Sequence, residues 1–521
     1  MTLHSDDRAG APGTRRFLRL GLPPSLIAAA VLLLFTLGAR AIGWGPSVIN
    51  PDESIFSLAA REVTAGHLPY LTLFDNKPVG STLILASGFA LFGQSVLVVR
   101  LIGAAFAFAS GMLVAALLRG GGFGRREALS AGIVQIAYAS ALGLGGQATL
   151  TELLLAPFTV LAVLLLRRLA VDERPGRRAA LAGAAGLACG VAVLIKIVPI
   201  LPGLAVAGAT LLLLLVRRRV TPKSAALLFA AFAAGAVAPM LVAAGVYAAT
   251  GALDAFLWSN FGFAGAYAGI HPRPAMMAQR LGTAVDALWP LLALCVVALS
   301  GAVAAWRKER RVDDLLLIAL AWVVAEVIAA SASLQFFPHY FLTAVPALAV
   351  LSAYGVRVIA GWIGAARPGR VALVLGGLAA LVAVERTQVD MARERLATPD
   401  VPAKVAAAIR RAAPDRALGR APTLFVTNYK LSGIYFLTGS PLPPTRFAIP
   451  AHLFSRQSAM TRADPQAEVA RVIASRPEFI VFDDVEPLPA WARARFDGVA
   501  ADYRPFQAVG TVRVLRRTGF R

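Results

Sequence analysis

The chain has 521 residues, of which 58% are hydrophobic and only 15% are charged, and its formal net charge is +22. A soluble protein carries about 25% charged residues, so this composition excludes an ordinary soluble protein and indicates a membrane protein with many spans. The positive charge does not indicate a nucleic-acid partner, because the arginines cluster in short loops between apolar runs. That pattern is typical of cytoplasmic loops of membrane proteins.

Apolar runs of about twenty residues recur along the chain, and each can cross a hydrocarbon core about 30 Å thick. The polar residues 1–24 predict a cytoplasmic tail, and residues 25–386 predict an all-α membrane domain of about eleven transmembrane helices. The expected spans are 25–43, 95–118, 127–146, 150–166, 179–196, 198–216, 224–249, 283–305, 312–331, 339–357 and 371–386. Every second loop is basic, so the N-terminus is expected in the cytoplasm and the C-terminus outside.

Two long segments are expected on the outer face. The first external loop, residues 44–94, contains the apolar stretch Val79–Phe92, which is too short to span a bilayer and predicts an interfacial or re-entrant helix. The second, residues 251–282, is rich in aromatic side chains, which favour the membrane interface. Two cysteines inside apolar runs predict neither a disulfide nor a metal motif.

The composition changes after residue 386, where charged residues and prolines become frequent. Thr423–Thr427 and Phe479–Phe482 have the pattern of buried strands, whereas Leu431–Thr438 and Gln466–Ser475 have that of short helices. Residues 387–521 therefore predict a small soluble α/β domain, which the topology places on the periplasmic or extracellular side.

The first candidate catalytic residues are Asp52 and Glu53, directly after the first span. Asn50 can cap a helix, Pro51 suits its first turn, and both acids complement the helix dipole, so a purely structural role explains the pair. Alternatively, a carboxylate at the membrane face can serve as a general base that deprotonates a hydroxyl group. The sequence by itself leaves both interpretations open.

Charged and polar groups near the predicted outer ends of the spans are candidates for binding a donor or substrate. A lysine there can neutralise a lipid-linked phosphate, but it can equally be an ordinary snorkelling side chain, and charges inside spans can be structural ion pairs. The candidates are Lys77, Asp75, Arg100, Glu152, Lys196, Tyr267, His271, His339 and Tyr340. The chain has no Walker-type loop and no clear metal motif, so no cofactor is assigned, and a divalent metal ion stays open.

The order of these elements resembles the glycosyltransferases of family 39, which have the GT-C fold and include protein O-mannosyltransferases and lipid A aminoarabinose transferases. The resemblance begins with Asp52-Glu53 after the first span and covers essentially the whole chain. Its further motifs are Lys77-Pro78 before a short helix that ends in Leu91-Phe92-Gly93, then Val99-Arg100-Leu101, Thr151-Glu152-Leu153, Leu194-Ile195-Lys196 and His339-Tyr340-Phe341 ahead of Pro346. One departure is Asn76-Lys77-Pro78-Val79, where the family more often has Lys-Pro-Pro.

The resemblance implies an inverting enzyme of a bacterial inner membrane. It would transfer one sugar from a polyprenyl-phosphate donor to a lipid, glycan or protein acceptor on the extracytoplasmic face. Asp52 would be the catalytic carboxylate with Glu53 beside it, and Lys77 would help to hold the donor phosphate. The alternative is a multi-pass transporter or flippase of a lipid-linked or sugar substrate, in which the outer charges bind substrate without bond cleavage.

Overall fold

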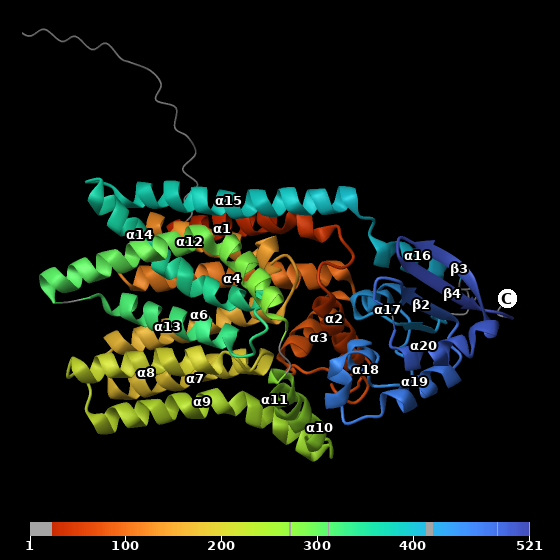
Figure 1. The fold of residues 1–521 in the computed structure, drawn as a ribbon. Coiled ribbons are helices and arrows are strands. Elements are labelled where there is room, and N and C mark those ends of the chain that lie inside the picture. Colours follow the sequence, from red (N-terminus) through yellow and green to blue (C-terminus); the bar gives the residue numbers. More distant parts are fainter. Residues whose placement is uncertain (1–22, 270–271, 311, 413–419, 487, 520–521) are drawn as a thin grey trace, which may run out of the picture.

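The structure, a computed structural model, describes residues 23–269, 272–310, 312–412, 420–486 and 488–519. A bundle of long helices fills one end of the molecule, and a smaller α/β region fills the other (Figure 1). Nine helices of the described part are long and apolar enough to cross a membrane. They contain α1 (Pro24–Arg40), α4 (Val96–Gly120), α6 (Thr151–Val171), α7 (Pro175–Ile195), α9 (Pro222–Ala249), α12 (Pro274–Glu309), α13 (Asp314–Ser331), α14 (Val345–Trp362) and α15 (Pro368–Ala397).

The other two predicted spans, 127–146 and 198–216, correspond to shorter helices that are not among these nine. They are α5 (Arg125–Ala139), with 15 residues, and α8 (Ile200–Val216), with 17 residues. The sequence predicted a span through residue 146, but α5 ends earlier because a glycine-rich turn follows, in which Gly145 takes a φ of 68°. The last span differs in the other direction, since α15 continues to Ala397, beyond its predicted end at residue 386.

Small side chains set the close packing of the bundle. A Cβ atom on Gly186 of α7 would clash with the carbonyl oxygen of Phe232 on α9, and one on Gly190 would clash with that of Ala236. In lipid, the hydrophobic effect does not drive helices together, so close backbone contact at small residues supplies much of the attraction. These glycines therefore bring α7 and α9 together along their length.

The first external loop folds into two helices, α2 (Pro51–Thr64) and α3 (Gly80–Phe92). The side-chain oxygen of Asn50 accepts a hydrogen bond of 2.9 Å from the backbone N–H of Asp52, and Pro51 occupies the first helical position, so α2 begins where the sequence predicts. The short apolar helix expected at Val79–Phe92 is confirmed as α3. Its 13 residues are too few to span a bilayer.

The aromatic segment 251–282 is more helical than a loop. It forms α10 (Leu253–Leu257), a π-helical turn η3 (Trp258–Gly262) and α11 (Phe263–Ala268), and α12 already begins at Pro274. Phe263 is buried against Phe74 of the first external loop, with ring centroids 5.3 Å apart. The segment thus packs over the first loop, which positions it above the site described below.

The C-terminal region is a four-stranded sheet with helices around it. Its strands are β1 (Leu424–Val426), β2 (Phe479–Asp483), β3 (Tyr503–Val509) and β4 (Val512–Arg517), in the order β1-β2-β4-β3, and only β1 and β2 are parallel. Its helices are α16 (Val401–Ala412), α17 (Gly433–Thr438), α18 (Ala451–Phe454), α19 (Pro465–Ala474) and α20 (Ala490–Asp497). The predicted strands and helices are present, whereas the β3–β4 hairpin was not predicted.

Helix α2 is shared between the two parts of the molecule. One of its faces lies in the core of the C-terminal region, where the buried residues are Ile55, Leu58 and Ala59 together with Ile409, Val426, Ile434 and Tyr435. The other face contributes Phe56 and Ala60 to a cluster with Leu85, Phe89 and Val99. Each fully buried Leu or Phe contributes about 1.5–3 kcal/mol, so both parts hold α2 in place.

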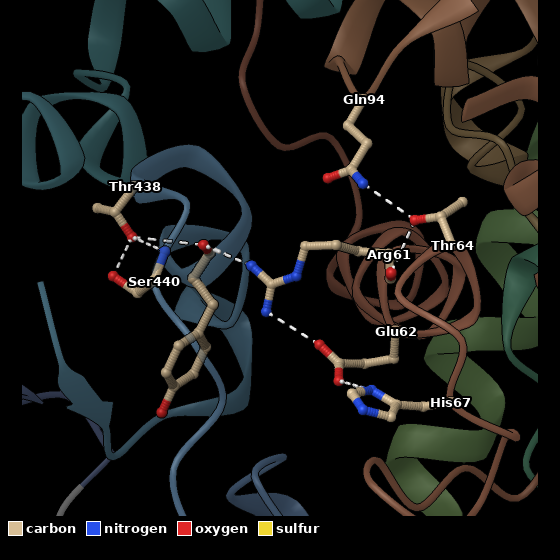
Figure 2. A network of polar contacts seen from close by, with 8 residues as sticks. Arg61, Glu62, Thr64, His67, Gln94, Thr438 and Ser440 are labelled. Atoms are coloured by element: carbon tan, nitrogen blue, oxygen red, sulfur yellow. Dashed lines mark hydrogen bonds and ion pairs between the residues drawn. The ribbon is translucent and has the colours of Figure 1, made fainter. Parts of the chain in front are cut away.

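A polar network fastens the end of α2 to α17 (Figure 2). The guanidinium of Arg61 points towards α17, donates a hydrogen bond of 3.2 Å to the carbonyl oxygen of Tyr435, and lies 3.4 Å from the carboxylate of Glu62. Glu62 in turn contacts His67 at 3.1 Å. Hydrophobic and polar contacts therefore act together to fix the C-terminal region on the first external loop.

Candidate active site

Asp52 and Glu53 are neighbours in sequence but face different parts of the molecule. They occupy the second and third positions of α2, and consecutive helical residues project about 100° apart. The Asp52 side chain lines a cavity and is 31% exposed, whereas the Glu53 side chain is 6% exposed and lies outside that cavity. The helix thus separates two carboxylates that the sequence treated as a pair.

The cavity has a volume of about 740 Å³ and lies between the helix bundle and the C-terminal region. Its walls include the N-terminal ends of α2 and α6, the chain after α7, and the 3₁₀ helix η4 (Pro338–Ala344). Eight of the residues that the sequence predicted for the site line it, namely Asp52, Asp75, Lys77, Glu152, Lys196, Tyr267, His339 and Tyr340. Segments far apart in the chain therefore converge on one cavity.

Lys77 is the cation closest to the candidate base. Its Nζ atom lies 3.6 Å from Oδ2 of Asp52, and its backbone carbonyl accepts a hydrogen bond of 2.8 Å from the hydroxyl of Tyr70. Burial by itself lowers the pKa of Lys77, but the carboxylates of Asp52 and Asp75 outweigh this effect and raise the pKa above its ordinary value. Lys77 is therefore a permanent positive charge beside Asp52.

Asp75 lies on the same loop and is buried. It accepts a hydrogen bond of 2.7 Å from the backbone N–H of Asn76. Burial raises the pKa of this carboxyl group, and the charge of Lys77 offsets part of the rise. The side chain thus shapes the loop that presents Lys77.

A second charged cluster lines the membrane-domain wall of the cavity. The Nζ atom of Lys196, which ends α7, lies 2.5 Å from Oε1 of Glu152, at the start of α6. The same ammonium stacks over the ring of Tyr340 at 4.0 Å, and Nε2 of His339 lies 4.0 Å from Glu152. The wall therefore carries a lysine and a carboxylate held in a fixed arrangement by aromatic neighbours.

Glu53 and Arg100 form a buried ion pair beside the cavity rather than within it. Both side chains are almost completely buried, and a carboxylate oxygen of Glu53 also accepts a hydrogen bond of 2.8 Å from the backbone N–H of Thr149. Arg100 donates a further hydrogen bond of 3.1 Å to the carbonyl oxygen of Gly43. These contacts tie the start of α2 to the bundle and place Glu53 and Arg100 outside the cavity, away from the other predicted site residues.

The remaining two predicted residues lie on the aromatic segment. Tyr267 lines the cavity from α11, and burial raises its pKa to about 12, so its phenol stays neutral and can donate a hydrogen bond. His271 lies outside the described residues.

The C-terminal region supplies cavity residues that the sequence did not reveal. The polar ones are Thr427, Asn428, Tyr429, His452, Ser455, Gln457 and Glu486. Asn428 follows β1, Glu486 follows β2, and the side-chain amide of Asn428 donates a hydrogen bond of 2.7 Å to Asp483 at the end of β2. Ligands often bind where parallel strands end, so the polar residues after the two predicted strands were a usable indication.

The described residues contain no group of three or more His, Cys, Asp or Glu side chains placed to hold a metal ion. The cationic side chains that line the cavity in this part of the chain are lysines, Lys77 and Lys196.

Residues 76–243 match the family model described as dolichyl-phosphate-mannose-protein mannosyltransferase. No curated protein sequence matches the chain. The crystal structure of ArnT from Cupriavidus metallidurans bound to undecaprenyl phosphate is similar, with a TM-score of 0.62 and 16% identity over 95% of this chain and 98% of that chain. The apo state of the same protein gives a TM-score of 0.63 and 15% identity, over 94% of this chain and 97% of that one. The chain has the GT-C fold.

A second GT-C protein is similar over a smaller part of its length. The archaeal oligosaccharyltransferase AglB from Archaeoglobus fulgidus, in complex with an inhibitory peptide and a dolichol-phosphate, gives a TM-score of 0.50 and 14% identity. The similarity covers 88% of this chain and 69% of AglB. At these identities the comparison shows a common fold, and the roles of individual residues in this GT-C protein rest on the geometry above.

Proposed function

We propose that this GT-C protein is an inverting glycosyltransferase that moves a single sugar from a polyprenyl-phosphate donor to a hydroxyl group of a lipid, glycan or protein acceptor. The observation that carries the proposal is the placement of Asp52 beside Lys77 in a cavity where the bundle meets the C-terminal region. A carboxylate and an ammonium group are what glycosyl transfer from a lipid phosphate requires: one accepts the proton of the acceptor and the other stabilises the leaving phosphate.

The reaction can be written with this chain's own groups. The acceptor oxygen forms a bond to the anomeric carbon of the sugar as the bond from that carbon to the phosphate oxygen breaks. The phosphate leaves with the bonding electrons and its charge is stabilised by Lys77, while the acceptor proton moves to the carboxylate of Asp52. The acceptor attacks from the side opposite the leaving group, so the configuration at the anomeric carbon inverts.

Lys196 supports the same assignment. It lies on the membrane-domain wall, and Glu152 and Tyr340 fix its direction. Two lysines on the side nearest the bundle suit a phosphate whose hydrocarbon tail stays in lipid. The polyprenyl phosphates bound to ArnT and AglB have this chemistry, which favours a polyprenyl phosphate as the donor here.

The orientation of the protein follows from its basic loops. The α8–α9 and α12–α13 connections lie at the end of the bundle away from the C-terminal region (Figure 1). The first connection contains Arg217, Arg218 and Arg219, the second contains Arg310, and Arg307 lies in the last turn of α12. Basic loops stay in the cytoplasm, so we assign the cavity and the C-terminal region to the extracytoplasmic face of a bacterial inner membrane.

The test measures release of polyprenyl phosphate from a panel of polyprenyl-phosphate sugars by the purified protein in lipid nanodiscs, with mixed membrane glycolipids, glycans and hydroxyl peptides as acceptors. Asp52→Asn keeps the shape of the side chain but removes the base, so we expect turnover to fall by about 10²–10⁴-fold while donor binding persists. Lys77→Met should instead weaken donor binding.

Asp390→Asn is the matched control, because Asp390 is an exposed aspartate outside the cavity with an ion pair to Arg393 at 3.7 Å. Equal turnover by the Asp52→Asn variant and the wild type would remove Asp52 from the mechanism. Transport is measured separately in proteoliposomes. Movement of the bound donor across their membrane, without cleavage by any variant, would support the flippase alternative instead.

A further inference from the structure

The cavity has two walls of different chemistry. The bundle and the first loop contribute its lysines and three carboxylates, Asp52, Asp75 and Glu152. The side chains contributed by the described part of the C-terminal region are neutral apart from Glu486, which is paired with Lys430 at 2.6 Å. We call the side formed by the bundle and the first loop the charged wall, and the side formed by the C-terminal region the neutral wall. Neutral hydrogen-bonding groups and aromatic rings thus face the charged wall.

His452 is a buried polar side chain of the neutral wall. It lines the cavity, is only 6% exposed, and packs edge-on against Phe74 with ring centroids 4.9 Å apart. Within the described part of the chain neither ring nitrogen has a hydrogen-bond partner, and Nδ1 is fully buried. An unpaired polar group at this depth costs about 1–3 kcal/mol, and because Nδ1 is out of reach of the cavity, the ring nitrogen left to meet a ligand is Nε2.

Burial, with a smaller contribution from the charge of Lys77, lowers the pKa of His452 to about 3. The ring is therefore neutral near pH 7, so its Nε2 can donate or accept one hydrogen bond, depending on the tautomer, but cannot neutralise an anion.

We propose that His452, with Asn428, Tyr429 and Gln457, forms the acceptor subsite, and that it takes an uncharged saccharide through its hydroxyl groups. This inference rests on the proposed function, because inversion places the acceptor on the side of the sugar opposite the phosphate, and the lysines put the phosphate on the other wall. Amide, phenol and neutral imidazole groups match the mixed donor and acceptor character of sugar hydroxyls, and the face of Tyr429 can pack against a sugar ring.

Two observations disfavour other acceptors. Within the described residues, an anionic acceptor would find no free cation on this wall. Arg280, which acts electrostatically on Tyr429, is already stacked on Phe337 at 3.8 Å and donates a hydrogen bond to the carbonyl oxygen of Gln335. An extended peptide could pair with the edge strand β1, but the backbone N–H of Val426 on that strand already donates to the hydroxyl of Tyr435 at 3.1 Å.

The experiment is saturation-transfer-difference NMR on the full-length protein in nanodiscs that contain undecaprenyl phosphate, which fills the donor side. The probes are eight neutral disaccharides including trehalose and cellobiose, with trehalose 6-phosphate as the matched anion and a capped Ser/Thr tetrapeptide. We expect at least one neutral disaccharide to bind, and trehalose 6-phosphate to bind more weakly than trehalose.

Three variants assign the binding to the neutral wall. His452→Leu should weaken disaccharide binding by about tenfold, equivalent to about 1.4 kcal/mol, and it should fold because it replaces an unpaired polar group by an apolar one. His452→Gln restores a hydrogen-bonding group at the position of Nε2 and should recover most of the affinity. His67→Leu, at an exposed histidine outside the cavity, should bind as the wild type does.

The inference is overturned if no neutral disaccharide binds, if the phosphorylated disaccharide or the peptide binds better, or if His452→Leu binds as the wild type does. Retention of undecaprenyl phosphate is measured separately by ³¹P NMR of washed protein. Loss of that retention in the wild type would count against the proposed donor, whereas a saccharide failure with the lipid retained would count against the acceptor subsite alone.

Discussion

Replacing each of the adjacent acids Asp52 and Glu53 by its amide should have opposite effects. Glu53→Gln should lower stability and keep turnover, whereas Asp52→Asn should keep stability and lower turnover. Glu53→Gln leaves the guanidinium of Arg100 buried without a counter-charge, because that side chain is only 1% exposed. The new amide can still accept the hydrogen bond from the backbone N–H of Thr149, so the loss is chiefly that of the ion pair. Breaking a buried pair by removing one partner costs about 3–5 kcal/mol. Asp52→Asn removes only a half-exposed charge and should cost less than about 1 kcal/mol.

The assay is thermal unfolding in nanodiscs, followed by intrinsic fluorescence, together with turnover measured well below the melting temperature. With an unfolding entropy of about 2 cal/mol/K per residue, a cooperative unit of 521 residues loses about 1 °C per kcal/mol, so Glu53→Gln should melt about 3–5 °C lower. It should keep substantial turnover when folded. Asp52→Asn should melt within about 1 °C of the wild type and lose turnover.

A double variant separates the ion pair from other effects. Glu53→Met combined with Arg100→Met replaces the pair by apolar side chains, and its loss of stability should be smaller than the sum of the two single losses. The reasoning is refuted if Glu53→Gln is as stable as the wild type but inactive, because Glu53 would then act in the chemistry.

Three further outcomes are expected. A Cβ on Gly433 would lie 2.6 Å from a methyl carbon of Val48, just before α2. Gly433→Leu should therefore separate α17 from α2, raise amide hydrogen exchange in both helices and lower turnover. Gly377→Leu is the control, because the space around Gly377 is open, and it should change neither exchange nor turnover. Lys196→Met should raise the KM for the donor and cost about 3 kcal/mol of stability, and adding Glu152→Gln should restore stability in thermal melts but not donor affinity. The pKa of His452 is about 3 in the folded protein and about 6.5 in the unfolded chain. Between these pH values the unfolded chain binds more protons than the folded protein, so stability falls as the pH drops below about 6.5. His452→Gln should therefore lose less stability than the wild type between pH 6.5 and 5, and an equal loss would contradict a buried neutral ring.

The membrane architecture could be predicted from the sequence because the bilayer imposes a local rule. A helix that spans lipid needs about twenty apolar residues and satisfies its own backbone, so length and composition identify it without knowledge of its neighbours. The short helix α3, the strands β1 and β2, and the helix cap at Asn50 are local in the same sense. The strands β3 and β4 were missed because only pairing with β2 buries one face of β4.

The candidate site was predictable only in part. Charged residues stand out against apolar spans, so the sequence alone predicted that Asp52, Lys77, Glu152 and Lys196 are exceptional and that they lie at the same end of the bundle. The tertiary structure decided which of them share a cavity. It also separated Asp52 from Glu53, because the pitch of α2 sends one carboxylate to the cavity and the other to Arg100.

The role of the C-terminal region also depends on the tertiary structure. Its neutral wall is built by chain segments that follow β1 and β2, and these reach the cavity only because the region packs on α2. A sequence pattern reports whether a residue is buried in its own helix or strand, but not which distant element lies against it. The sequence thus determined a membrane bundle with charged residues at the ends of its helices, and the packing of the C-terminal region decided which further residues complete the site.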